Sequence, residues 1–284
     1  MESVIVRKGD TGFRLALFII FFACGILVFP LAANYYSLLP TNDSTLYKAA
    51  VPVLFLGVSL LLRRSQRLHD YWRIAYAFFV ASAANLLVWL GGTWLFRLVN
   101  APADPLAEMA VNKLSEATVV IAVILLLTRL AGWKLGDLYI RRGNSRLGLV
   151  LALGFSIPVV VMFVAMGGLS LGWEIVLAAA PAILVYSLLN GFMEELWFRG
   201  IFLREYKRLL GGGTAILLTA LLFTIMHFGM TYASGAERIQ LLGGILYLGL
   251  ATAYIILKTE SLWGAVLLHA VADAVLLLGF FAAP

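Results

Sequence analysis

Long apolar segments alternate with short polar ones along the whole chain. Each apolar segment approaches the roughly 20 residues that a helix needs to cross a bilayer. Hydrocarbon offers the backbone no hydrogen-bonding partner, so such segments form helices. The pattern therefore predicts an all-α fold, a polytopic transmembrane helical bundle of about nine spans. The predicted spans cover residues 13–34, 46–62, 74–96, 111–130, 147–169, 174–198, 213–230, 239–257 and 261–282.

Two of these segments are less regular than the others. Lys48 lies inside the second, and Lys113 and Glu116 lie in the fourth. A charged side chain in the middle of a membrane costs roughly 2.5–3.5 kcal/mol on insertion scales. A bundle of eight spans is therefore the alternative.

The first segment follows Arg7 and Lys8, as the apolar region of a signal peptide follows its basic region. Its apolar run is longer than a signal peptide usually contains, and no clear small-residue cleavage site follows it. We therefore expect a first span that is retained.

Composition supports a membrane protein. Hydrophobic residues make up 62% of the 284 residues and charged residues 13%, whereas soluble domains average about 45–50% and about 25%. The single cysteine, Cys24, excludes an internal disulfide framework and a cysteine-based metal cluster. The sequence therefore predicts an integral, multi-pass membrane protein, located in the cell membrane if its source is prokaryotic.

The net charge of +6 reflects membrane topology. Of the 21 Lys and Arg residues, 17 lie on the first, third, fifth, seventh and ninth polar segments, and 4 lie on the segments between them. Because basic residues concentrate on the cytoplasmic side, this bias places the N-terminus inside and the C-terminus outside. The expected partner of this surface is the lipid bilayer and not a nucleic acid, and the oligomeric state is left open.

The polar residues divide the chain into two parts. Residues 1–146 form N-terminal transmembrane helices and end in a basic, partly apolar loop that we expect to lie along the cytoplasmic headgroups. Residues 147–284 form a C-terminal catalytic helical core, because nearly all polar groups within apolar segments lie there, with the motifs in 190–273. The two parts do not resemble each other, which disfavours a transporter built from inverted repeats.

The first motif is the stretch NGFMEELWFR, at the end of the sixth span. Glu195 and Arg199 are four residues apart, so on a helix they share a face and can form an ion pair. Glu194 points about 100° away, on the side of Asn190, and stays free to act as a general base. Alternatively, the three charges only mark the cytoplasmic end of the helix.

Two histidine motifs follow in later spans. FTIMH places Phe223 and His227 four residues apart in the seventh span, and HAVAD places His269 and Asp273 on one face of the last span. Asp273 is positioned to orient the imidazole of His269 through its N–H. Each motif alone also fits a structural role, as an interhelical hydrogen bond or as a pair that satisfies itself.

The three motifs together point to hydrolysis. Six ionisable side chains in three apolar helices would be costly unless they converged. A converged set would supply a base, imidazole donors or ligands and a pocket for water, which suits hydrolysis of an amide by an activated water. The sequence contains no H-E-x-x-H, which disfavours a zincin helix.

In order and spacing, the motifs resemble those of a known family. The patterns EExxxR, FxxxH and HxxxN/D, in successive or near-successive membrane helices, are similar to the motifs of the CPBP family, the CAAX prenyl protease 2-like or Abi proteins. The residues that carry the resemblance are Glu194, Glu195, Arg199, Phe223, His227, His269 and Asp273. It covers about residues 174–282 and implies an intramembrane endopeptidase whose helical core encloses a polar cavity facing the cytoplasm.

The resemblance also implies a role for each motif. Glu194 would activate a water with help from His227, and the pair in the first motif would shape the site. His269 and Asp273 would stabilise the oxyanion or bind a metal. An aspartate at this position, unlike the alternative asparagine, offers only acceptors unless it is protonated. This leaves His269 as the oxyanion donor.

A metal stays open at this stage. Family members are commonly described as metalloproteases, and a metal-free glutamate mechanism has also been argued. A zinc ion held by His227, His269 and a carboxylate, Glu194, would suit known three-ligand catalytic sites. We assign Asn190 and Phe223, which precede these residues by one helical turn, to substrate binding.

Depth in the membrane limits how the motifs can meet. With a rise of about 1.5 Å per residue, Glu194 lies about 8 Å from the cytoplasmic end of its span, and His227 lies about 21 Å from that side. The two depths can match if Gly211–Gly213 lie outside the hydrocarbon or if the sixth helix extends beyond Arg199. We expect the second, because the stretch IFLREYKRLL continues a helical pattern after Arg199. Arg199 then lies inside the membrane.

Two other functions remain open. One is a catalytically silent membrane scaffold or immunity factor of the same fold. The other, which the missing repeats disfavour, is an ion-coupled transporter that uses the same carboxylates and imidazoles. The substrate of the protease would be a peptide or a membrane-protein segment, and the sequence does not identify which one or whether it is prenylated.

Overall fold

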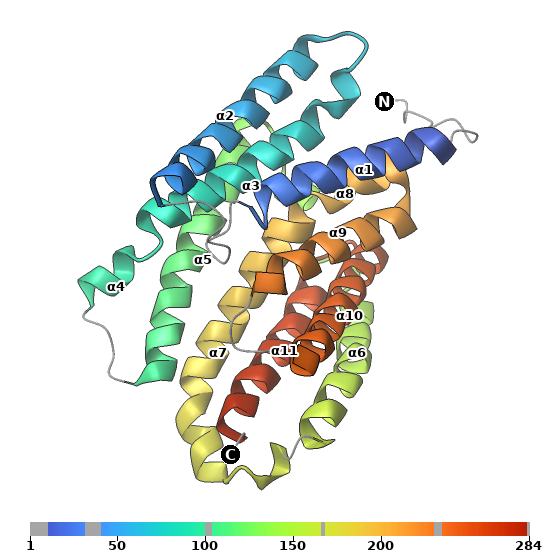
Figure 1. Ribbon diagram of the computed structural model, residues 1–284. Helices are drawn as coiled ribbons and strands as arrows, with labels where there is room; N and C mark the ends of the chain where they lie inside the picture. Colours follow the sequence, from blue (N-terminus) through green and yellow to red (C-terminus); the bar gives the residue numbers. More distant parts are fainter. Residues whose placement is uncertain (1–10, 32–40, 100–103, 166–167, 230–234, 283–284) are drawn as a thin grey trace.

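The computed structural model describes residues 11–31, 41–99, 104–165, 168–229 and 235–282. Within these ranges the regular structure is helical throughout, as predicted (Figure 1). Arg7 and Lys8, on which part of the predicted topology rests, lie outside the described residues.

Long helices occupy the positions of the predicted spans. In the N-terminal part these are α1 (Thr11–Val28), α2 (Thr41–Arg64), α3 (Trp72–Gly91) and α5 (Pro105–Leu130). In the C-terminal part they are α6 (Ser145–Ala165), α7 (Trp173–Glu195), α9 (Gly212–Met226), α10 (Gly235–Thr259) and α11 (Trp263–Ala282), and the eight-residue helix α8 (Leu203–Leu210) lies between α7 and α9. The connections hold the short helix α4 (Trp94–Leu98) and the 3₁₀ turns η1 (His69–Tyr71), η2 (Leu135–Leu138), η3 (Gly168–Ser170) and η5 (His227–Gly229).

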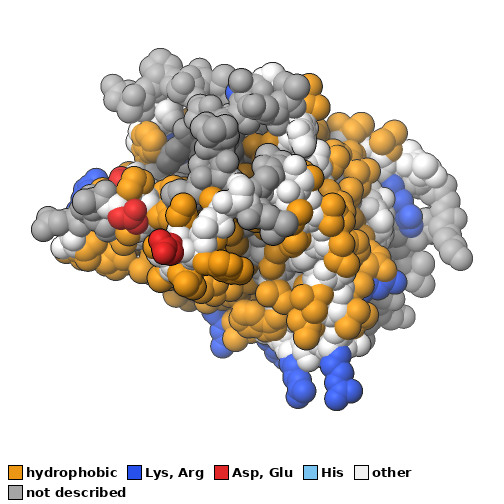
Figure 2. Space-filling view, turned by 90° about the horizontal axis from the view of Figure 1, so that it is seen from below, with side chains coloured by type: hydrophobic (Ala, Val, Ile, Leu, Met, Phe, Trp, Pro, Cys, Tyr) orange, Lys and Arg blue, Asp and Glu red, His pale blue; other side chains and the backbone are white. Residues whose placement is uncertain are grey.

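The helices have the length and the surface of membrane spans. Among the described residues, 8 helical stretches are long and apolar enough to cross a bilayer, and the last helix carries a shorter apolar stretch, Trp263–Gly279. Large apolar side chains such as Val53, Ile157 and Leu177 are exposed. Figure 2 shows a face dominated by apolar side chains, with Lys and Arg side chains projecting from its edge. The chain is therefore an integral, multi-pass membrane protein, and the predicted polytopic bundle is confirmed.

The charges in the two less regular spans have partners. Lys48 of α2 is buried, and its Nζ lies 4.9 Å from the centre of the Trp89 ring, a cation–π contact. Lys113 of α5 forms an ion pair with Glu116 one turn later, with 2.6 Å between Nζ and Oε2. Such contacts lower the cost of a charge in an apolar helix.

The sixth predicted helix extends beyond Arg199, as expected. α7 passes directly into a π-helical segment, Leu196–Gly200 (η4), and α8 follows after a turn. The N–H of Ile201 donates to the carbonyl of Leu196, five residues earlier, at 3.2 Å. Arg199 is fully buried in this segment. Turns of π-helix are rare and frequently occur at functional sites.

Ion pairs join the polar segments at one end of the bundle. Asp137, in the loop before α6, pairs with Arg73 at 3.5 Å and with Arg204 of α8 at 2.6 Å. Arg141 of the same loop pairs with Glu260 between α10 and α11. Segments that the charge pattern assigns to one side of the membrane therefore lie together. The assignment of this side to the cytoplasm stays a prediction.

One hydrophobic core runs through both parts of the chain. Phe29, just after α1, stacks on Phe198 of η4 with 4.3 Å between ring centres, and Phe78 of α3 lies 5.0 Å from Phe202. The N-terminal helices thereby support the segment that carries Arg199. The predicted division into residues 1–146 and 147–284 is not tested by this packing and stays a prediction.

A glycine sets the spacing between two helices of the C-terminal part. α11 packs against α6, α7 and α10. A Cβ atom at Gly191 of α7 would lie 3.2 Å from the carbonyl oxygen of Val266 and 3.3 Å from the Cβ of His269. Backbone atoms cannot turn aside as a flexible side chain can. Gly191 therefore allows α7 and α11 to approach closely, just where both helices carry motif residues.

Gly191→Val should destabilise this contact by about 1–3 kcal/mol, the usual cost of overpacking. We expect a lower apparent Tm in thermal unfolding of the purified protein in detergent. Gly154→Val is the matched control, since a Cβ at this position of α6 meets nothing within 4 Å. Equal Tm values for the two variants would contradict the role assigned to Gly191.

Candidate active site

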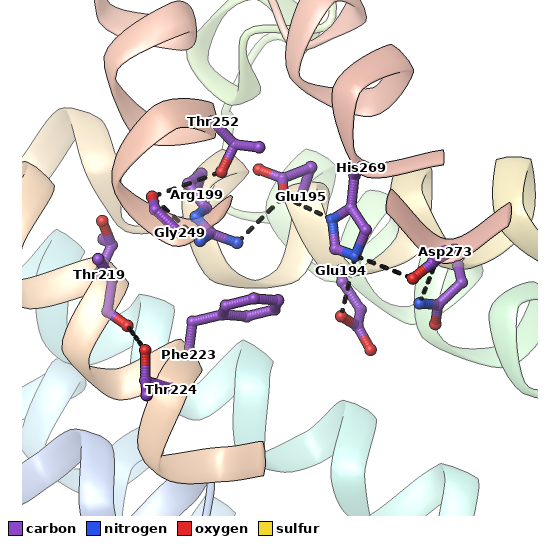
Figure 3. A network of polar contacts seen from close by, with 12 residues as sticks. Glu194, Glu195, Arg199, Thr219, Phe223, Thr224, Gly249, Thr252, His269 and Asp273 are labelled. Carbon is purple, nitrogen blue, oxygen red and sulfur yellow. Dashed lines mark hydrogen bonds and ion pairs between the residues drawn. The ribbon is translucent and has the colours of Figure 1, made fainter. Parts of the chain in front are cut away.

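The three sequence motifs meet in the interior of the bundle. Figure 3 shows Glu194, Glu195 and Asp273 around His269, with Arg199 and Phe223 beside them. The motifs come from the end of α7 and from η4, from the junction of α9 with η5, and from the middle of α11. The residues brought together are Glu194, Glu195, Arg199, His227, His269 and Asp273. Convergence is what the cost of isolated charges in an apolar helix predicts.

Glu195 and Arg199 form the predicted ion pair. Arg199 Nη1 donates to Glu195 Oε1 at 3.1 Å, and both side chains are 0% exposed. Nη2 donates to the carbonyl of Gly249 in α10 at 3.3 Å, and the guanidinium lies 4.3 Å from the centre of the Phe223 ring. A buried charge without its partner costs several kcal/mol, so the two residues depend on each other.

The imidazole of His269 is fixed by the same carboxylate. Its Nδ1 lies 2.7 Å from Glu195 Oε1, and the side chain is 2% exposed. Since an ionised carboxylate only accepts hydrogen bonds, Nδ1 carries the proton and Nε2 faces the other way. Nε2 lies 3.5 Å from Glu194 Oε2 and 3.8 Å from Asp273 Oδ1.

This arrangement corrects one expectation. The partner of the Nδ1–H of His269 is Glu195 and not Asp273, which lies on the Nε2 side. Asp273 instead accepts a hydrogen bond at Oδ2 from Nδ2 of Asn190, at 2.9 Å. His269 and Asp273 share a face of α11 because they are four residues apart. Glu195 of the neighbouring helix α7 nevertheless lies closer to the imidazole than Asp273 does.

His227 is held by a hydrogen bond to a backbone carbonyl of the preceding turn. It follows the last residue of α9, and its Nδ1 donates to the carbonyl of Phe223 at 2.7 Å. In the neutral imidazole this leaves a lone pair on Nε2. Nε2 lies 3.8 Å from Glu194 Oε2. Both histidines therefore direct Nε2 at the same carboxylate.

Glu194 differs from its neighbour in its surroundings. Its side chain is 12% exposed, whereas that of Glu195 is 0% exposed. Glu194 Oε2 is buried and has no direct hydrogen-bond partner among the described residues. It lies beside two imidazole nitrogens at distances longer than a hydrogen bond. The predicted free carboxylate thus sits at the centre of the site.

Asn190 and Phe223 lie at the edges of the cluster. The Phe223 ring packs 4.4 Å from the ring of His227 and 5.7 Å from that of His269, measured between centres. These contacts and the hydrogen bond of Asn190 are made with other motif residues. The substrate-binding role of Asn190 and Phe223 stays a prediction.

The donor groups can be tested against a zinc ion. Two ligands of one tetrahedral zinc, each about 2.0–2.2 Å from it, are about 3.4 Å apart. Each histidine has nearly this spacing from Glu194 Oε2. Within the described part of the chain, however, no group of three or more His, Cys, Asp or Glu side chains is placed to hold a metal. The arrangement does not fit a three-ligand site, and zinc at His227, His269 and Glu194 stays a prediction.

One residue of the site, Gly249 of α10, lies outside the three motifs. Gly249 offers its carbonyl to Arg199, and a Cβ there would lie 3.1 Å from Arg199 Nη2 and from Ala220 Cα. The only signal in the sequence was a glycine in an apolar helix.

A G-x-S-x-G pattern also occurs, at Gly168–Gly172. It lies in η3 and the turn before α7, whereas a nucleophile elbow needs a turn from a strand into a helix.

Comparison with known proteins agrees with the geometry. Residues 176–275 match the model of the family described as type II CAAX prenyl endopeptidase Rce1-like. The matched segment contains all the motif residues. No curated protein and no solved structure gives a significant match. The chain thus contains a segment, residues 176–275, that is similar to the Rce1-like type II CAAX prenyl endopeptidases.

Proposed function

We propose that the protein is an intramembrane endopeptidase that hydrolyses a peptide bond with a water molecule activated by Glu194. One observation carries the proposal: Glu194 Oε2 lies 3.5 Å from Nε2 of His269 and 3.8 Å from Nε2 of His227. The other ring nitrogen of each histidine is already engaged. A carboxylate base and two directed imidazoles are the groups that activation of a water requires.

Glu194 acts as the general base. Its distances to the imidazoles are too long for direct hydrogen bonds, yet they allow one water to contact the carboxylate and an imidazole together. The water gives a proton to Glu194 while its oxygen attacks the carbonyl carbon of the scissile bond. A C–O bond forms, and the π electron pair of the carbonyl moves to its oxygen.

The two histidines act on different atoms. The Nε2 lone pair of His227 accepts a hydrogen bond from the water and positions it. His269, as an imidazolium, keeps Nδ1–H on Glu195 and donates Nε2–H to the oxyanion. Asp273 cannot donate as a carboxylate, but it stabilises the imidazolium from 3.8 Å away. Charges in a site with apolar walls such as Phe223 interact strongly.

Collapse of the tetrahedral intermediate completes the reaction. The C–N bond breaks, and the proton that Glu194 received passes to the leaving amine. One water is consumed, and a carboxylic acid and an amine are formed. We propose that the substrate is a peptide or a membrane-protein segment that enters from the side predicted to be cytoplasmic.

A suitable probe follows from the family. The C-a-a-X motif of its name is a C-terminal sequence whose cysteine is prenylated. A fluorogenic peptide that ends in a farnesylated C-a-a-X sequence is therefore the first substrate to test, followed by libraries of membrane peptides.

Glu194→Gln and His227→Asn should each lower the cleavage rate, by about 10²–10⁴-fold for the loss of the general base. The measurement is kcat of the purified protein with the farnesylated probe. Glu174→Gln is the matched control, since Glu174 is an exposed glutamate in the first turn of the same helix. Full biological activity of the Glu194→Gln protein would favour the silent scaffold instead.

Arg199→Met should unfold or strongly destabilise the protein, because it leaves Glu195 buried without its cation, at a cost of about 3–5 kcal/mol. The double variant Glu195→Gln, Arg199→Met removes both charges and should recover most of the apparent Tm. It should not recover activity, because a neutral amide holds His269 less firmly than a carboxylate does. A double variant as unstable as Arg199→Met would show that the pair is not the dominant interaction.

Removal of metals should leave the cleavage rate unchanged, since every proposed step uses side chains and water alone. The protein is dialysed against a chelator, analysed for bound metals and assayed with the farnesylated probe. Loss of activity that added zinc restores in the wild type would overturn the metal-free mechanism. It would support zinc binding by His227, His269 and Glu194.

A further inference from the structure

A second, partly buried ion pair lies beside the candidate site, on a helix outside the matched family segment. Lys113 and Glu116 of α5 are paired at 2.6 Å, and their side chains are 9% and 24% exposed. Both lie in the helix Pro105–Leu130, which is long and apolar enough to cross a membrane. Ionisable groups at such positions are costly and usually serve a function.

The pair adjoins the motif residues. Lys113 Nζ lies 5.4 Å from the centre of the Tyr186 ring on α7. Tyr186 precedes Asn190 by one helical turn, and Asn190 donates to Asp273. The ammonium therefore lies against α7, one helical turn before the residue that binds Asp273.

Helix packing does not require these charges. α5, α7 and α11 already meet through an apolar cluster in which Leu106 and Tyr186 pack against Ala179, Ile183 and Leu277. A pair of apolar side chains at 113 and 116 would extend this cluster without any desolvation of charge. Helix packing therefore does not explain why an ion pair is present at these two positions.

Among the described residues of the site, the cations are already engaged, because the proposed imidazolium of His269 bonds Glu195 and is directed at the oxyanion. The site holds the carboxylates Glu194, Glu195 and Asp273, and its guanidinium, Arg199, is engaged by Glu195 and by the Gly249 carbonyl. A bond within a C-terminal C-a-a-X sequence is followed by at most three residues, so its cleavage brings the C-terminal carboxylate close to this acidic site. Three extended residues span at most about 10 Å, so a cation that receives this carboxylate has to lie beside the site, as Lys113 does.

We propose that Lys113 is the substrate-binding residue that pairs with the C-terminal carboxylate of the peptide, and that Glu116 occupies the ammonium until the peptide arrives. The inference rests on the proposed function, because it assumes a peptide in the cavity. It assigns to the N-terminal part of the chain a direct contribution to specificity. An exchange of one carboxylate for another leaves the buried ammonium paired throughout.

The test compares two forms of the farnesylated C-a-a-X peptide, one with a free C-terminal carboxylate and one with a C-terminal amide. Binding to the inactive Glu194→Gln protein is measured by fluorescence anisotropy, so the result does not depend on turnover. We expect the acid to bind about tenfold more tightly than the amide, as for one hydrogen-bonded charge pair. Lys113→Met should abolish this preference, and Lys113→Arg should keep part of it.

Glu116→Gln should change the preference for the acid in the opposite direction. Without the competing carboxylate, the acid should bind several-fold more tightly, and the amide should bind as before. This variant leaves Lys113 in place, so it tests the proposal even if Lys113→Met fails to fold. Lys48→Met is the matched control, because Lys48 is also a buried lysine on an aromatic ring in a span. It should leave the preference intact.

The outcomes separate this proposal from the proposed function. Equal binding of acid and amide, or an acid preference that survives Lys113→Met, would overturn the role of Lys113. Equal weakening of both peptides by Lys113→Met would assign the pair to helix packing alone. Wild-type protein that binds the acid preferentially but cleaves neither peptide would contradict the protease and leave the carboxylate site standing.

Discussion

One carboxylate oxygen organises the site. Glu195 Oε1 accepts hydrogen bonds from Arg199 and from His269, and all three side chains are buried. In an apolar interior, the guanidinium keeps the carboxylate ionised and the carboxylate keeps the proton on Nδ1 of the imidazole. The direction of His269 Nε2, and with it the chemistry proposed for Glu194, depends on this arrangement. The positions of α7, α10 and α11 all bear on it, because each helix supplies one of its contacts.

Two adjacent glutamates differ in their surroundings because the helix turns by about 100° between them. Glu195 faces the packed interior and is fully buried, whereas Glu194 faces the histidines and keeps part of its surface. The proposed choice of Glu194 as the base therefore rests on its surroundings and not on residue type. The same side chain holds structure together where its charge is fully paired, and is available for chemistry where its partners stay at 3.5 Å or more.

Much of this arrangement follows from local physics that the sequence displays. Apolar length fixed the spans, helical spacing paired Glu195 with Arg199, and the cost of buried charge required the motifs to meet. The bond from Glu195 to His269 depends instead on how α11 packs against α7, and the two helices approach each other closely at Gly191. The position of Lys113 beside Tyr186 is likewise a product of tertiary structure. The sequence showed the lysine only as an irregularity in a span.

The order of the spans has a consequence for biosynthesis. Arg199 lies in the same helical stretch as Glu195, so their charges can compensate each other as soon as this stretch enters the membrane. His269 belongs to the last helix and reaches Glu195 only after three further helices have been made. A nascent chain therefore holds the Glu195–Arg199 ion pair before the imidazole can join it. The proposed site is complete only once the last helix has packed against α7.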